Sequence, residues 1–161
     1  MVKIEYLFSE GKISRIGEIE LEKYTDFLLN SYKDNLDHAK ATIFSFPRWS
    51  IISGYYAMHD IAKLFLAKQF RIKIEREVHA TTIKVLRELI KNKEIIKLIE
   101  IGYNTFLSLA NDLEEAKKER AKVQYYTGTR FMHEEYEKKA LSFYENIVIK
   151  YIKKIQVLLK K

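Results

Sequence analysis

The residues best suited to bind an anionic substrate lie in one short segment, residues 117–128 (KKERAKVQYYTG), which combines four cations with two adjacent tyrosines. Arg120 and Lys122 could bind phosphate, the arginine through its planar fork of donors. Tyr125 and Tyr126 could stack on RNA bases. The segment therefore predicts an RNA- or phosphate-binding site. The alternative is an ordinary charged helix end with two tyrosines packed beneath it.

The histidines do not form a recognisable metal site. No two of them lie one helical turn apart, as a zinc-binding pair on a helix would require, and the Glu-x-x-His pairs of di-iron bundles are absent. His59 lies beside Asp60 in a very apolar stretch, where a lone histidine is usually a hydrogen-bonded core residue. We expect no metal ion. The four histidines are His38, His59, His79 and His133.

Other catalytic signatures are missing as well. The five glycines form neither a dinucleotide-binding fingerprint nor a phosphate loop, and there is no G-x-S-x-G motif. The chain has no cysteine, which excludes disulfides, thiolate catalysis and cysteine-ligated zinc. We expect no cofactor.

Length and composition indicate one globular domain, residues 1–161, with 47% hydrophobic and 32% charged residues. The formal charge of +7 favours an anionic partner such as nucleic acid, although interleaved Lys and Glu are also typical of heat-stable proteins. The longest apolar runs are four residues, too short to cross a bilayer, and the N-terminus lacks a secretory apolar block. We therefore expect a cytoplasmic protein without a membrane partner.

Apolar residues recur every three or four positions along most of the chain, which predicts long amphipathic helices. The first should run from Glu20 to Phe44 and end before Pro47. The second should begin at Ser50 and reach Gln69, and it is apolar on most sides, which places it in the middle of a bundle.

A third helix should begin near His79 and continue past Asn92 to a break at Gly102, where a fourth would follow. A last helix should follow residues 127–129, with a stripe that includes Ile147. Residues 1–19 form an irregular lead-in in which a short helix or a small hairpin is equally compatible with the pattern. The predicted fold class is all-α, an antiparallel up-and-down bundle of four to five helices.

Three stretches resemble HEPN domains. The run Tyr55–Leu66 (YYAMHDIAKLFL) is similar to their second helix, and His79 falls where many members have a histidine opening helix 3. The stretch Glu119–Tyr125 (ERAKVQY) looks like the arginine-containing end of their helix 4. The block before Leu21 is similar to the lead-in of archaeal members.

The resemblance implies a helical bundle that pairs as a homodimer and works beside a minimal nucleotidyltransferase, often as toxin and antitoxin. Active members of the family are metal-independent RNases. Their motif is an arginine followed, after four to six residues, by a histidine. The arginine holds the scissile phosphate, while the histidine moves protons to and from the ribose hydroxyl and the leaving oxygen.

This sequence departs from that motif. Arg120 matches the arginine, but Tyr125 stands where the histidine should be, and His133 comes thirteen residues after Arg120. A tyrosine with an ordinary pKa of about 10 is a poor proton shuttle at neutral pH. We therefore expect a non-catalytic HEPN-type module that binds a partner protein, such as a nucleotidyltransferase, or a nucleic acid. The alternative is a metal-independent RNase of toxin type that uses Arg120 with His133, His59 or Tyr125.

Two surfaces are predicted to make these contacts. Phe131 and Tyr144 lie beyond the core stripe of the last helix and suit a two-fold contact between copies. The segment 69–93 holds seven Lys or Arg against three Glu, and the last helix adds Lys150, Lys153 and Lys154. If these cations share a face, they should bind RNA weakly and in a salt-dependent manner.

Overall fold

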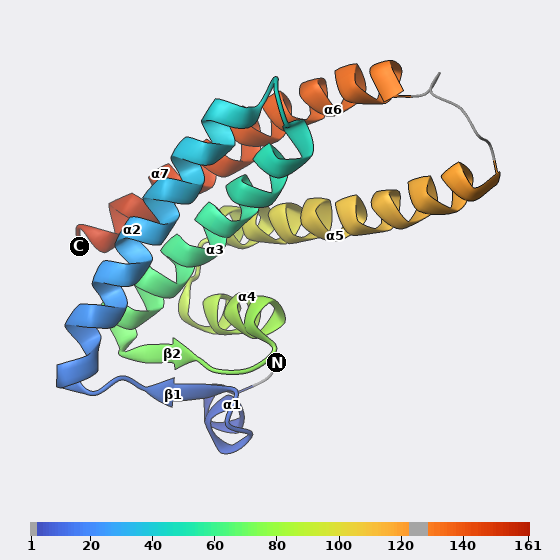
Figure 1. Cartoon of the computed structure of the whole chain (residues 1–161). Helices are drawn as coiled ribbons and strands as arrows, with labels where there is room; N and C mark the ends of the chain where they lie inside the picture. The colour runs from blue at the N-terminus through green and yellow to red at the C-terminus, as the bar shows by residue number, and fades with distance from the viewer. Residues whose placement is uncertain (1–2, 123–128) are drawn as a thin grey trace.

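The computed structural model describes residues 3–122 and 129–161, without the side chains of 110 and 112–132. Over these ranges the chain is almost entirely helical, and the predicted all-α bundle is confirmed (Figure 1). The elements are, in chain order, α1 (Ile4–Ser9), β1 (Ile13–Arg15), α2 (Glu18–Thr42), α3 (Pro47–Phe70), β2 (Ile72–Ile74), α4 (Val78–Leu89), α5 (Lys93–Lys122), α6 (Thr129–Phe143), the π-helical turn η2 (Tyr144–Val148) and α7 (Ile149–Leu159).

Helix α3 lies at the centre of the fold, as its apolar sequence predicts. It pairs along its length with α2 and also contacts α4, α5, α6 and α7. A Cβ at Gly54 would lie 3.0 Å from Cγ2 of Val148, so the missing side chain lets α3 and η2 approach closely. The predicted start of this helix at Ser50 is wrong. The helix begins at Pro47, because proline suits a first helical position, where no N–H is needed.

The lead-in contains both a helix and a strand. Helix α1 is followed by β1, and β1 pairs with β2 in an antiparallel ribbon, in which Ile13 faces Ile74 and Arg15 faces Ile72. The three isoleucines of this ribbon are buried. Strand β1 precedes α2 and β2 follows α3, so both lie at the open end of the α2–α3 hairpin, and the ribbon ties the N-terminal segment to the end of α3 (Figure 1).

The boundary between α4 and α5 differs from the prediction. The helical pattern is interrupted before Lys93, where Oδ1 of Asn92 accepts hydrogen bonds from the backbone N–H groups of Glu94 and Ile95 and caps α5. The predicted break at Gly102 is wrong, because α5 continues through it. A Cβ there would lie 3.0 Å from Sδ and Cε of Met58, so this glycine allows close packing of α5 on α3.

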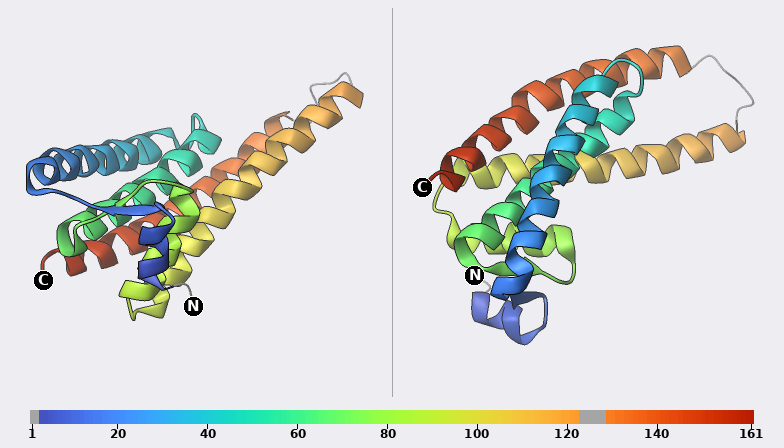
Figure 2. Two further views of the ribbon diagram at one scale, coloured as in Figure 1. Left: turned by 90° about the horizontal axis from the view of Figure 1, so that it is seen from below. Right: turned by 60° about the vertical axis from the view of Figure 1, so that its left-hand side comes forward.

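The last helical segment is one rod made of α6, η2 and α7 (Figure 2). Phe143 and Val148 are both buried, and the step of five residues between them fits the wider π turn of η2. The predicted stripe is therefore wrong at Ile147, which is only partly buried, while Val148 takes its place in the core.

Helices α5 and α6 run beyond the rest of the bundle at one end. Both views of Figure 2 show the C-terminal half of α5 extending away from α2 and α3, with its end apart from the start of α6. Within the described ranges, none of the helices is long and apolar enough to cross a bilayer.

Candidate functional site

The residues predicted to bind RNA or phosphate lie at the projecting end of α5. Arg120 and Lys122 belong to its last turn, and their side chains are outside the description. Tyr125 and Tyr126 lie outside the described residues. The structure thus gives the helix on which Arg120 stands, and its place at one end of the molecule (Figure 1).

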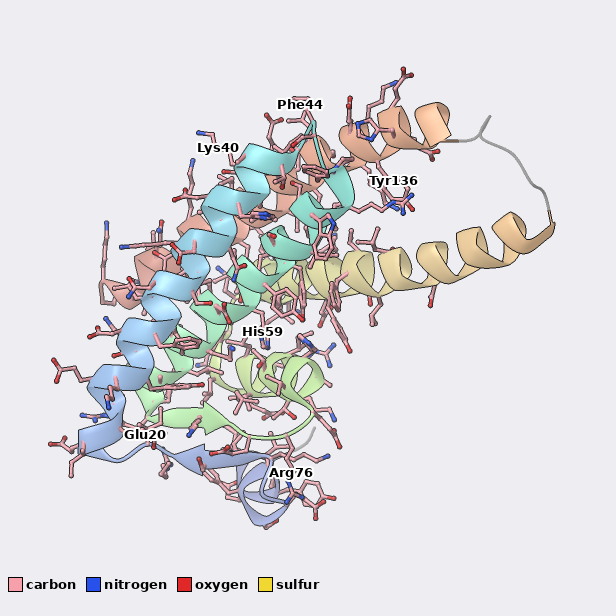
Figure 3. The ribbon with its side chains drawn as sticks, in the orientation of Figure 1. Glu20, Lys40, Phe44, His59, Arg76 and Tyr136 are labelled. Atoms are coloured by element: carbon pink, nitrogen blue, oxygen red, sulfur yellow. The ribbon has the colours of Figure 1, made fainter. Side chains whose placement is uncertain are left out.

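A second candidate site was only partly visible in the sequence. It is a cluster of six rings, in which four aromatic side chains pack around two histidines, one on α3 and one on α4, and we call it the aromatic–histidine cluster. Figure 3 labels one of these histidines, His59 of α3. The spacing is helical, because rings four residues apart on α3 and three apart on α5 lie on one face. The six residues are Tyr55, Tyr56 and His59 of α3, His79 of α4, and Tyr103 and Phe106 of α5.

Tyr55 and the two histidines form the inner part of this cluster. The ring centroids of His59 and His79 are 4.7 Å apart, and the Tyr55 ring lies 4.8 Å from that of Phe106. Tyr55 and His59 are buried, whereas His79 is only partly so. The cluster therefore reaches from the core of α3 to the surface at the start of α4.

His59 is held neutral by its surroundings. Its Nε2 lies 3.1 Å from Oγ1 of Thr82, and because that hydroxyl donates to the Val78 carbonyl, the imidazole N–H is the donor. Burial, followed by the charge of Lys63, lowers the pKa of His59 to about 3. Its Nδ1 is buried without a hydrogen-bond partner among the described residues. At neutral pH this histidine carries no charge.

His79 has a different environment on the same cluster. The Tyr55 hydroxyl lies 2.9 Å from its Nδ1, and burial raises the pKa of Tyr55, so the phenol remains protonated and donates. Burial and the charge of Lys63 lower the pKa of His79. The neutral ring therefore carries its proton on Nε2.

Asp60, next to His59 in the sequence, has a structural role. Its carboxylate accepts hydrogen bonds from Ser31 at 2.6 Å and Asn35 at 3.2 Å, both on α2. It also forms an ion pair with Lys63 at 2.8 Å. A buried carboxylate requires such partners, and this network connects α2 to α3.

The histidines do not gather around Arg120. His79 lies against Phe106, with ring centroids 5.8 Å apart, and Arg120 is fourteen residues further along the same helix, about 21 Å away at 1.5 Å per residue. His133 is engaged elsewhere, since its Nε2 lies 3.1 Å from the Phe44 carbonyl and 2.9 Å from Oε1 of Glu137.

Sequence reasoning missed the surface at the junction of α2 and α3. Phe44, Phe46 and Trp49 are 63%, 61% and 60% exposed there. Three large aromatics within six residues, around the single proline, were the available signal. We call these three residues the junction aromatics.

Some of the cations of the basic surface predicted from residues 69–93 are paired with acids. Ion pairs join Lys73 to Glu20 and Arg87 to Glu100, and Lys154 of α7 pairs with Glu94. Among the described side chains, no group of three or more histidines and carboxylates is placed to hold a metal ion.

Comparisons of the chain with family models, curated proteins and solved structures find no match.

Proposed function

We propose that the protein is a non-catalytic binding module of the HEPN type, which acts by contact with a partner protein or a nucleic acid. The observation that carries this proposal is the engagement of the histidines away from the end of α5. Arg120 can contribute a charge that binds phosphate, but RNA cleavage also needs a group that takes and gives a proton. His59, His79 and His133 each have other contacts in the described part of the chain.

A protein partner is the better supported of the two classes. Nucleic-acid affinity depends on cations that neutralise successive phosphates, and several of the lysines and arginines are already paired with acids. Exposed aromatic side chains are instead typical of contact surfaces between proteins. The resemblance to HEPN domains suggests a minimal nucleotidyltransferase as this partner, in a toxin–antitoxin pair of archaeal type within the cytoplasm.

A homodimer is also proposed on the basis of that resemblance. Of the two aromatics expected to form the contact, Tyr144 packs against the core and is only partly exposed, and the side chain of Phe131 is outside the description. The mass by light scattering at tens of micromolar protein should be twice that of the chain. A monomeric mass would remove this part of the proposal.

The decisive experiment is an RNA cleavage assay on the purified protein with chelator present. We expect no cleavage above background, and we expect weak RNA binding that falls as salt rises. The matched pair of variants is Arg120→Ala and Arg87→Ala, the second being an arginine that is ion-paired on α4. Robust cleavage abolished by the first variant but not the second would establish the metal-independent RNase in place of the binding module.

A further inference from the structure

The junction aromatics form an unusually exposed apolar surface on a rigid piece of backbone. The N–H of Phe46 donates to the Thr42 carbonyl at 2.8 Å, and the Phe46 carbonyl accepts from Ser50 N–H at 3.1 Å. The Ser50 hydroxyl, which is buried, donates to the Ala39 carbonyl at 2.6 Å. Because α2 and α3 are connected by these bonds, the three side chains are presented on a fixed scaffold.

Two cations flank the junction aromatics. The Arg48 guanidinium lies over the Tyr136 ring of α6, 4.8 Å from its centroid. Lys40 is exposed near the end of α2, four residues before Phe44, and Figure 3 labels Lys40 and Phe44 at this end of the α2–α3 hairpin. No ion pair joins either cation to an acid among the described residues. The surface is therefore apolar, with these two cations on one edge and the hydrogen-bonded pair of His133 and Glu137 beside the Phe44 carbonyl.

The size of this surface limits what can cover it. An aromatic side chain buries about 150–250 Å² when fully covered, so three that are about 60% exposed offer on the order of 300–450 Å². A stable interface between two folded proteins buries about 800 Å² on each side. The area of the junction aromatics alone is too small for a stable dimer of folded domains, but a short helical segment could cover it.

The charges of Arg48 and Lys40 distinguish between the remaining candidates for what covers the junction aromatics. A two-fold contact between copies would bring Arg48 and Lys40 toward the same cations of the second copy, which is unfavourable. Single-stranded nucleic acid would need a longer row of cations along its backbone than these two. A segment with an apolar face and acidic neighbours would satisfy both the aromatic and the cationic parts.

We propose that the junction aromatics, with Arg48 and Lys40, are the docking site for a short amphipathic helix with an acidic edge, contributed by a partner protein. Trp49 and the phenylalanines would insert into the apolar face of that helix, and the cations would face its carboxylates. This inference rests on the proposed binding function and deepens it, because it names the surface and the chemistry of the partner.

Trp49 makes the test direct, because it is the single tryptophan of the chain and its fluorescence reports this surface alone. Three probes are compared on the full-length protein. The first is a synthetic amphipathic peptide with leucines at positions i, i+3, i+4 and i+7 and glutamates beside them. The second is its twin with lysines in place of the glutamates, and the third is single-stranded oligouridine.

We expect the glutamate peptide to move the emission of Trp49 to shorter wavelength and to protect it from acrylamide. The lysine peptide and oligouridine should leave it unchanged. Phe46→Ser should lower the affinity of the protein for the glutamate peptide by about ten-fold or more. Phe27→Ser is the matched control, since Phe27 is 65% exposed on α2 but seventeen residues before Phe44, about 25 Å along the helix. It should bind the peptide as the wild type does.

The charge reversal Arg48→Glu should exchange the preference, so that the lysine peptide binds more tightly than the glutamate peptide. Equal responses to both peptides, a larger response to oligouridine, or no response to the glutamate peptide would each overturn the docking site. An effect of protein concentration on Trp49 emission would assign the surface to contact between copies instead. The proposed function fails separately, through RNA cleavage, which does not involve Trp49.

Discussion

The molecule contains two groups of aromatic side chains that differ in almost everything except residue type. In the aromatic–histidine cluster, the rings of three helices contact one another, and Tyr55 is completely buried. In the junction aromatics, Phe44, Phe46 and Trp49 each leave about 60% of their surface in solvent. Burial of aromatic surface stabilises a fold, whereas exposed aromatic surface does not. The first group therefore serves stability, and the second is available for binding.

The difference is also electrostatic. The cluster lowers the pKa of both histidines by burial and so keeps the interior neutral. The junction keeps Arg48 beside its aromatics, in a cation–π contact with Tyr136. Removal of a ring should therefore change stability in one group and binding in the other.

Replacement of Tyr55 by alanine should be the most damaging change. It removes a fully buried ring from between α3 and α5, and such large-to-small changes cost about 3–5 kcal/mol. The neighbouring Tyr56→Ala is the control, because that ring is 37% exposed and should cost about 1 kcal/mol. Urea unfolding followed by circular dichroism measures both. Equal losses would mean that the two rings do not differ in their contribution to the core.

The neutral His59 should make the protein sensitive to mild acid. Because its folded pKa, about 3, is below the unfolded value of about 6.5, the unfolded chain binds a proton first as the pH falls. The stabilisation is complete above about pH 6.5 and is lost between there and about pH 3. At pH 5 the expected loss relative to pH 7.5 is about 2 kcal/mol.

Unfolding measured at both pH values should show this loss in the wild type and a smaller one in His59→Gln. Thr82→Val is the control at the same place, because it removes the hydroxyl that accepts from Nε2 but leaves the titrating ring. It should be less stable than the wild type at both pH values and keep the full pH dependence. A wild-type pH dependence that persists in His59→Gln would assign it to other groups.

Two buried hydroxyls provide a finer test. The Tyr55 hydroxyl donates to Nδ1 of His79, so Tyr55→Phe should destabilise by about 1 kcal/mol. The Tyr151 hydroxyl is buried without a partner in the described part of the chain. Since an unsatisfied buried hydroxyl is unfavourable, Tyr151→Phe should be neutral or stabilising. Thermal unfolding of the two variants beside the wild type compares them. A loss in Tyr151→Phe as large as in Tyr55→Phe would indicate a hydrogen bond at Tyr151.

The helices could be predicted because their signal is local. The apolar stripe of α2 and the almost unbroken apolar character of α3 follow from spacing alone. The error at Gly102 has a long-range cause, since the glycine is needed for the approach of Met58 from another helix. The π turn before Val148 similarly depends on what α3 presents to the last rod.

The candidate site was less predictable for the same reason. His59 and His79 are twenty residues apart, and only the packing of α4 on α3 brings their rings together. In the sequence Phe44 and Trp49 look like core aromatics, because the pattern of residue types does not show which side of the α2–α3 junction other elements cover. Some cations of the basic segments looked free in the sequence but pair with acids far along the chain, as Lys73 does with Glu20.

The smallest effect is expected for the junction aromatics, and it completes the comparison. Phe46→Ser should change the free energy of unfolding by no more than about 0.5 kcal/mol, because surface substitutions outside packed contacts seldom exceed this. The same variant should be retained less on a hydrophobic-interaction column, since it removes an exposed ring from an apolar surface. A loss of more than about 2 kcal/mol would show that Phe46 belongs to the folded core, and the division of the aromatics into a stabilising and a binding group would then be wrong.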